Sequence, residues 1–252
     1  MSLSIKLGNF LYKNAFILYK PLYTSFKNRQ DAFEIKLLEQ YVRPGDVVLD
    51  IGANIGYYAL ILSDLVGKKG RVHCFEPDKK NFNYLEKATR SKGNITINHK
   101  AASSQTGAIK IYTSKNLNVD HRTYKPEEYD QEIEIEAVSI DDYLVKNLKE
   151  EGGRVDFLKM DIQGFEMEAI QGMHRLLRKN NDIKIISEFW PCGLKKAGSS
   201  VTSYFKFLTE NGFNCHLLEK NSLVKLTLEK VSSLEGLGEE HYFNIFASRA
   251  DV

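Results

Sequence analysis

Short apolar runs alternate with amphipathic stretches along most of the chain. Residues 47–51 are apolar except for Asp50, and a stretch of helix-like composition at 57–66 follows and ends at Gly67. A continuous apolar run is typical of a strand buried on both faces, and a strand, a tight turn and a helix begin a βαβ unit. This opening pattern therefore predicts an α/β fold.

The same alternation continues toward the C-terminus. Asp31 and Glu34 have the spacing of a capping box, which predicts the start of the helix that leads into the first strand. A helix from Glu166 is predicted to bury Met173 and Leu177. Further strands are predicted at 71–75, 95–97, 155–160, 183–187, 213–218 and 242–247, with 222–226 as a candidate extra strand. These elements predict a single α/β domain with a doubly wound, mostly parallel sheet.

Two alternating segments interrupt the βα pattern. Residues 108–112 and 132–138 alternate apolar and polar side chains, which predicts an inserted β-hairpin or a pair of edge strands. The polar connection between them is long for a compact domain, and loops of that length are usually lids or substrate loops. His121 beside Asp120 is a candidate general base in this loop, and a solvated surface histidine is an equal alternative.

The first thirty residues differ from the rest, because no acidic residue precedes Asp31. Lysines recur there at sevenfold spacing, at Lys6, Lys13, Lys20 and Lys27. One interpretation is a basic amphipathic helix on a membrane surface or an anionic glycolipid. We favour a helical extension that covers the ligand cleft or packs on a second subunit of a homodimer, because Pro21 interrupts the pattern. The predicted organisation is an extension at 1–30 and a main domain at 31–252.

Composition narrows the class of protein. With 252 residues, 42% hydrophobic residues and a net charge of +2, the chain can bury a full core and offers no electrostatic case for a nucleic-acid partner. Three cysteines, Cys74, Cys192 and Cys215, fall in a predicted strand, a loop and a strand, without metal or disulfide spacing. This pattern favours the cytoplasm. No apolar run approaches the roughly 18 residues of a membrane span, and no cleavage pattern indicates a signal peptide.

The turn after the first strand is the predicted ligand site. A dinucleotide fingerprint would place glycines where Asn54 and Tyr57 stand, and a side chain at the first of these positions blocks a pyrophosphate. S-adenosylmethionine brings only a carboxylate and an amino group to such a loop, which leaves room for a small polar side chain. The alternative is a strand-to-helix turn without a ligand. The predicted cofactor-binding residues of this loop are Asp50, Gly52, Ala53, Asn54, Gly56 and Tyr57.

The second predicted strand ends in Glu76 and Pro77. In doubly wound folds a carboxylate at this strand end grips the ribose diol of a bound nucleoside. Glu76 can accept hydrogen bonds from both ribose hydroxyls, so both residues are assigned to the cofactor site.

Four motifs in this order resemble the FkbM family of S-adenosylmethionine-dependent methyltransferases. They are Asp50-Ile-Gly-Ala-Asn-Ile-Gly, Phe75-Glu-Pro, Ser139-Ile-Asp-Asp-Tyr-Leu and Lys159-Met-Asp-Ile-Gln-Gly-Phe-Glu. The resemblance implies a class I, Rossmann-like sheet of seven strands whose last strand is antiparallel. It also implies transfer of a methyl group to a hydroxyl of a saccharide or another natural product. In this fold an acid or amide often meets the adenine at the third strand end, but Lys100 and Ala101 stand here, so backbone near Ala101, or Ser103, is expected to replace it.

Two carboxylates are the predicted catalytic residues. Asp161 and Glu188 end the strands at 155–160 and 183–187, and ligands of open α/β sheets collect at such strand ends. Asp161 either accepts the proton of the acceptor hydroxyl or binds the ammonium of the cofactor. We assign no metal, because two carboxylates without a third ligand at a recognisable spacing are insufficient. Trp190 is either a platform for a sugar ring or a core residue.

Two other functions remain open on the sequence alone. A nicotinamide-dependent oxidoreductase on a related fold would bind NADH, which Asn54 disfavours. A non-catalytic protein that retains the methyltransferase fold would bind a partner through the basic N-terminus.

Overall fold

The computed structural model describes residues 3–112, 129–148 and 152–251. Its main sheet has eight strands in the order β10-β9-β11-β8-β7-β1-β2-β3. Their bounds are β1 Val47–Ile51, β2 Arg71–Phe75, β3 Ile95–Asn98, β7 Phe157–Met160, β8 Lys184–Phe189, β9 Asn214–Glu219, β10 Ser222–Lys225 and β11 Phe243–Ser248. Neighbouring strands from β3 to β8 are parallel, and β11 runs antiparallel between β8 and β9.

This arrangement confirms the predicted doubly wound, mostly parallel sheet with an antiparallel final strand. The predicted count of seven strands is one too low, because the candidate strand near 222–226 does form. It pairs with β9 as an antiparallel hairpin at the edge of the sheet.

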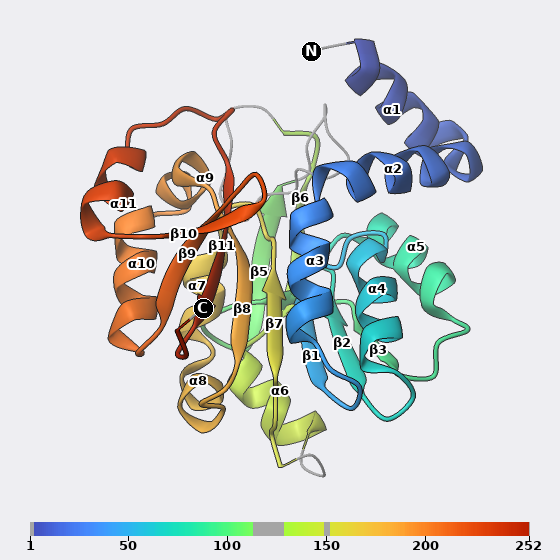
Figure 1. The fold of residues 1–252 in the computed structure, drawn as a ribbon. Coiled ribbons are helices and arrows are strands. Elements are labelled where there is room, and N and C mark those ends of the chain that lie inside the picture. Colours follow the sequence, from blue (N-terminus) through green and yellow to red (C-terminus); the bar gives the residue numbers. More distant parts are fainter. Residues whose placement is uncertain (1–2, 113–128, 149–151, 252) are drawn as a thin grey trace.

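Helices cover both faces of the sheet (Figure 1). Alternate residues of each strand point to opposite faces, so Val48 and Val72 pack in one core cluster and Val47 and Leu49 in the other. The first face carries α3 Ala32–Tyr41, α4 Tyr57–Val66 and α5 Lys79–Thr89. The second carries α6 Ile140–Asn147, α7 Glu166–Gln171, α8 His174–Lys179, α9 Pro191–Lys196, α10 Val201–Glu210 and α11 Leu228–Leu234. None of the helices in the described part of the chain is long and apolar enough to cross a membrane.

The register of the central strands fixes where the site forms. Ile51 at the end of β1 aligns with Phe75 at the end of β2 and with Met160 at the end of β7. Since parallel strands end at one edge of the sheet, the loops that follow them meet there.

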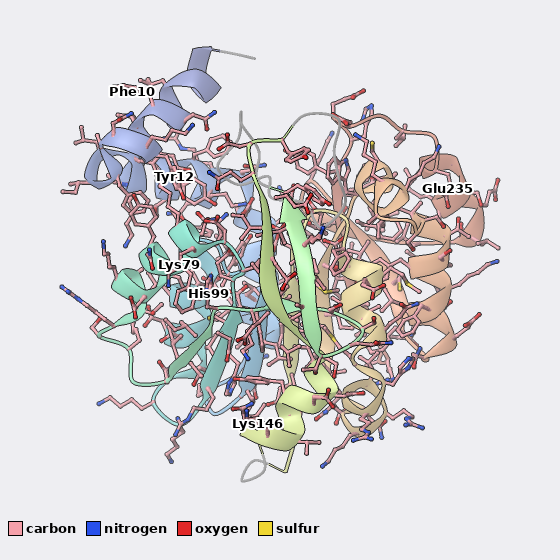
Figure 2. The ribbon with its side chains drawn as sticks, turned by 180° about the vertical axis from the view of Figure 1, so that it is seen from behind. Phe10, Tyr12, Lys79, His99, Lys146 and Glu235 are labelled. Carbon is pink, nitrogen blue, oxygen red and sulfur yellow. The ribbon has the colours of Figure 1, made fainter. Side chains whose placement is uncertain are left out.

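A second, small sheet confirms the inserted hairpin. Its antiparallel strands β5 Gly107–Tyr112 and β6 Glu132–Val138 are joined by β4 Ala101–Ala102, which runs parallel to β6. Figure 2 shows β5 and β6 in front of the main sheet when the molecule is seen from behind. Asp120 and His121 lie outside the described residues.

Two helices precede the main domain, α1 Leu3–Asn14 and α2 Phe16–Gln30, and they lie beyond one end of the sheet (Figure 1). Pro21 lies inside α2 without ending it. The capping box predicted at Asp31 and Glu34 is wrong, because α2 leads almost directly into α3 and leaves no free helix start. Asp31 makes no capping hydrogen bond, and its carboxylate instead accepts from the Tyr58 hydroxyl at 2.6 Å.

Two local predictions also differ from the structure. The helix predicted from Glu166 is divided into α7 and α8, and the break falls at Gly172. Gly172 passes so close to the backbone of Ser103 that an added Cβ would lie 2.1 Å from the Ser103 carbonyl oxygen. The loop predicted around Cys192 is the helix α9, which begins with Pro191 at its first position, a favourable place for proline.

Candidate active site

A cavity of about 570 Å³ lies where the carboxyl ends of β1, β2, β7 and β8 meet. It brings together nine of the eleven residues assigned to the site from sequence. They are Gly52, Ala53, Asn54, Tyr57, Glu76, Pro77, Ala101, Asp161 and Glu188. The other two, Asp50 and Gly56, are outside its wall among the described residues.

At Gly52 the loop after β1 closely approaches the loop after β7. Its φ of 84° lies in the left-handed region, and a Cβ there would lie 1.9 Å from the backbone oxygen of Asp161. The amide groups of Gly52 and Ala53 both donate to the Phe75 carbonyl at 3.0 Å. Only glycine allows the loops after β1 and β7 to approach in this way.

Asn54 and Glu76 are joined by a hydrogen bond across the cavity wall. The Asn54 amide donates to Glu76 Oε2 at 2.8 Å, and the Asp78 amide donates to Glu76 Oε1 at 2.9 Å. Burial raises the pKa of Glu76 to about 8, although these backbone donors act to lower it. Asn54 has a φ of 51°, which asparagine tolerates better than most residues. Both carboxylate oxygens are therefore held in fixed positions at the cavity.

Asp50 is fully buried in β1, behind the cavity wall. Within the described part of the chain neither of its carboxylate oxygens has a hydrogen-bond partner. Burial raises its pKa to about 6, while Lys159 acts to lower it. Its carboxylate therefore makes no hydrogen bond to the amides of the loop in the described structure.

Gly56 has a packing role. Its φ of 90° begins α4, and a Cβ there would lie 3.1 Å from Leu85 Cδ1 on α5. It lines a separate cavity of about 150 Å³ between α2 and α4, together with Tyr57, which borders both cavities.

Lys159 also lines the cavity. It begins one of the four family motifs, but the sequence alone did not indicate a role for it. It is buried in β7, its Nζ lies 3.5 Å from Asp161 Oδ2, and it lies 4.6 Å from the centre of the Tyr58 ring. Burial lowers the pKa of Lys159, but the carboxylates of Asp161, Asp50 and Glu34 together raise it above its ordinary value. A lysine among the apolar residues Phe157, Leu158 and Met160 of the predicted strand was the available signal.

Gln163 bridges the two predicted catalytic carboxylates. Its Nε2 donates to Asp161 Oδ1 at 3.2 Å and to Glu188 Oε1 at 3.3 Å. Burial raises the pKa of Asp161, but the ammonium groups of Lys159 and Lys27 overcome this and hold it below its ordinary value. Burial, followed by the negative charge of Asp161, raises the pKa of Glu188 well above its ordinary value. The two carboxyl groups therefore differ in basicity.

Glu166 holds the loop after β7 through a hydrogen bond to its backbone. This buried side chain accepts from the Ile162 amide at 2.9 Å, and burial raises its pKa to about 8. A Cβ on Gly164 would lie 2.3 Å from the carbonyl carbon of Gly193, so this loop also contacts α9 directly.

The helix α2 forms part of the cavity wall. The sequence alone did not indicate which of its residues would lie there. Tyr23 and Lys27 line the cavity. Lys27 forms an ion pair with Asp31 and lies 5.7 Å from the centre of the Tyr58 ring. Burial, and then the charge of Asp161, raises the pKa of Tyr23 above its ordinary value, so its phenol stays neutral. The extension thus lines part of the cavity, and its action as a cover stays a prediction.

The wall opposite the loop is aromatic and apolar. Trp190 is buried yet borders the cavity, and its indole N–H donates to the Glu239 carbonyl at 3.2 Å. It is therefore a core residue that also reaches the cavity, and its use as a platform for a sugar ring stays a prediction. At the other end Ala101 and Ile111 line the cavity, and Lys100 pairs with Glu136 at 2.6 Å.

The donor set suits S-adenosylmethionine, which combines a cationic sulfonium, an ammonium and a ribose diol. Asp50 is buried with two unpartnered oxygens in the described structure, and the Asn54 side-chain oxygen is likewise buried without a partner there. Gly52 keeps the loop free of a side chain, and Glu76 presents a fixed carboxylate. Among the described residues, four carboxyl side chains, those of Glu76, Asp161, Glu188 and Glu239, and three lysines, Lys27, Lys100 and Lys159, line the cavity.

Comparisons with known proteins identify the family. The family described as "Methyltransferase FkbM domain" matches residues 50–215. The chain is 30% identical over 152 residues to "Hexuronic acid methyltransferase AglP" of Haloferax volcanii. That alignment covers 58% of each protein, so the chain spans less than two thirds of this relative.

Solved structures share the fold at low identity. A Streptococcus mutans protein assigned as a methyltransferase and solved in complex with SAH has a TM-score of 0.50 and 10% identity, covering 85% of this chain and 94% of its own. The methyltransferase FkbM of Methylobacillus flagellatus has a TM-score of 0.48 and 17% identity, covering 91% of this chain and 54% of its own. The first of these supports the fold assignment.

Proposed function

This chain belongs to the FkbM family of methyltransferases, and from that premise we propose that it transfers the methyl group of S-adenosylmethionine to a hydroxyl group of a saccharide or glycosylated metabolite. The AglP relative is named for a hexuronic acid, so a uronic-acid sugar is the first acceptor to test. We further propose that residues 1–30 are an extension to a methyltransferase domain at 31–252.

The observation that carries the proposal is the position of Glu76 opposite the glycine turn. The backbone N–H groups of Asn54 and Asp78 hold its two carboxylate oxygens, and each oxygen retains a lone pair for a ribose hydroxyl. Gly52 lines the same cavity, where the methionine end of the cofactor would lie. When bound, the cofactor supplies a methyl group on a positively charged sulfur.

Glu188 is the better proton acceptor of the two carboxylates. In methyl transfer the acceptor oxygen would bond to the methyl carbon in line with the methyl–sulfur bond that breaks, S-adenosylhomocysteine would leave, and the oxygen must lose its proton. Because the pKa of Glu188 is raised and that of Asp161 is lowered, the ionised form of Glu188 is the stronger base of the two. Gln163 keeps the Glu188 carboxylate beside the cavity.

Asp161 binds a substrate or cofactor group and does not remove the proton. Paired with Lys159, its carboxylate stays charged and can orient the acceptor hydroxyl or attract the ammonium of the cofactor. Trp190 provides an aromatic wall on which the apolar face of a sugar can pack.

A direct test is a methyl-transfer assay with uronic-acid and neutral sugar glycosides as acceptors, read by mass spectrometry. We expect a product heavier by one methylene unit, stable to mild alkali because an ether has formed. The Glu188→Gln variant should lose at least about tenfold in kcat while its affinity for the cofactor is unchanged.

Alkali-labile methylation would contradict the hydroxyl as acceptor, because esters hydrolyse and ethers do not. A carboxylate acceptor carries no proton to remove, so Glu188→Gln would then keep its activity. Absence of methyl transfer to every glycoside would contradict the saccharide assignment and leave the cofactor assignment to be tested by binding.

A further inference from the structure

The two faces of α2 have different partners. Tyr19 and Tyr23 stack against each other on the inner side, with ring centres 5.4 Å apart, and Tyr23 reaches the cavity. The outer side carries Ile17, 88% exposed, with Leu18 and Leu22 close to 60%. Leu18 and Leu22 are four residues apart and form one apolar stripe, which the exposed Ile17 widens.

The helix α1 also carries exposed apolar residues. Leu7 and Phe10 are both more than half exposed, and Figure 2 shows Phe10 toward the outer part of α1. We define the outer surface as Leu7, Phe10, Ile17, Leu18 and Leu22.

Other contacts hold the helix pair to the domain. The Tyr12 hydroxyl donates to Asn81 Oδ1 at 2.5 Å, and the Phe16 ring stacks on Tyr84 at 3.5 Å. The hydroxyl of Tyr57, on α4, donates to Asn28 Oδ1, on α2, at 2.7 Å. The outer surface is therefore not needed to attach the helices, and its exposure requires another explanation.

Charge around the outer surface identifies its partner. Residues 1–30 contain no acidic residue, and Lys13 and Arg29 are exposed on the two helices. A two-fold contact with a second copy would bring the same basic side chains together without an acid to neutralise them. An anionic lipid surface offers both an apolar layer for the stripe and negative charge for the basic residues.

We infer that the outer surface of α1 and α2 docks on an anionic lipid bilayer, with both helices lying in the interface. Phe26 follows the outer stripe on α2 and also lines the active-site cavity, so docking places the mouth of that cavity at the lipid surface. The inference concerns binding and does not depend on the proposed methyl transfer.

Vesicle sedimentation of the full chain tests it. We expect the protein to sediment with vesicles of phosphatidylcholine and phosphatidylglycerol, and to remain in solution with phosphatidylcholine alone. The double variant Ile17→Ser, Leu22→Ser should partition at least about tenfold more weakly. Leu228→Ser on α11, which replaces a residue of similar exposure, should partition like the wild type.

Charge reversal provides a second arm. Lys13→Glu with Arg29→Glu should weaken binding, and raised salt should weaken the wild type in the same way. Circular dichroism and cofactor binding report whether each variant is folded, because none of the substituted residues lines the larger cavity.

Three outcomes would overturn the inference. They are no sedimentation with anionic vesicles, equal sedimentation of the wild type and the folded Ile17→Ser, Leu22→Ser variant, and a wild-type dimer that becomes monomeric in this variant. The last result would assign the outer surface to a second copy of the chain.

Discussion

Glu76 shows how a single buried carboxylate can couple ligand binding to pH. Its oxygens accept two backbone amides, yet burial still raises its pKa to about 8, so the free protein holds a proton there at neutral pH. Only the ionised carboxylate can accept from both ribose hydroxyls. Binding of the cofactor is therefore expected to expel this proton.

We predict that the affinity for S-adenosylhomocysteine rises as the pH increases toward and through about 8, with release of a proton on binding. Calorimetric titration in two buffers of different ionisation enthalpy measures the proton count. Glu76→Gln should abolish the release, and Glu76→Ala should weaken binding by about 1–3 kcal/mol. Identical proton counts in the wild type and Glu76→Gln would exclude Glu76 as the coupled group.

Gly52 and Gly45 permit a matched comparison. Both have a positive φ, but a Cβ on Gly52 would meet the Asp161 carbonyl, whereas nothing lies within 4 Å of one on Gly45. Gly52→Ala should lower the free energy of unfolding by at least about 2 kcal/mol and impair cofactor binding. Gly45→Ala should cost about 1 kcal/mol and leave binding intact. Urea denaturation and calorimetry measure both, and equal effects of the two substitutions would contradict the close approach.

The loop after β7 and the helix α9 form one structural unit. Gly164 and Gly193 meet through their backbones, and a Cβ on Gly193 would in turn lie 2.1 Å from the Trp190 ring. Because Gln163 precedes Gly164 and donates to both Asp161 and Glu188, we expect the spacing of the loop and the helix to set the distance between these two carboxylates.

Gly164→Ala is therefore expected to reduce kcat by at least about tenfold, because the loop must move away from α9. Gly198→Ala is the control, since Gly198 also has a positive φ but nothing within 4 Å of an added Cβ. Steady-state kinetics with thermal unfolding distinguishes the two variants. Equal kcat values would show that the contact does not position the carboxylates.

Helices and strands with a clear local pattern of apolar residues, glycines or acids could be predicted from the sequence. Contacts between residues far apart in the chain could not. The apolar run of β1, its glycine turn and Glu76 followed from pattern and position. The break at Gly172 arises from contact with Ser103, and the entry of Tyr23 into the site arises from the path of α2. Such contacts join residues far apart in the sequence, so no local pattern reports them.

The molecule as a whole buries several carboxylates with raised pKa values. Burial raises that of Glu34 to about 7, that of Asp50 to about 6, and those of Glu76 and Glu166 to about 8. Between their ordinary values and these raised values, the folded state binds protons that the unfolded state has lost. The free energy of unfolding therefore falls as pH rises through this range.

Urea denaturation at about pH 6 and about pH 9 should accordingly show lower stability at the higher pH. Glu166→Gln keeps the acceptor for the Ile162 amide and removes one titrating group, so the difference should shrink. Stability that rises with pH over this interval would contradict the raised pKa values.

The central measurement is a titration of S-adenosylhomocysteine into the full chain, freed of bound ligand and followed by calorimetry. We predict one equivalent bound in the wild type, weaker binding in Gly52→Ala and Glu76→Ala, and no heat with NADH. Binding of NADH, or binding of S-adenosylhomocysteine that both substitutions leave unchanged, would show that the cavity beside β1 and β2 is not the cofactor site.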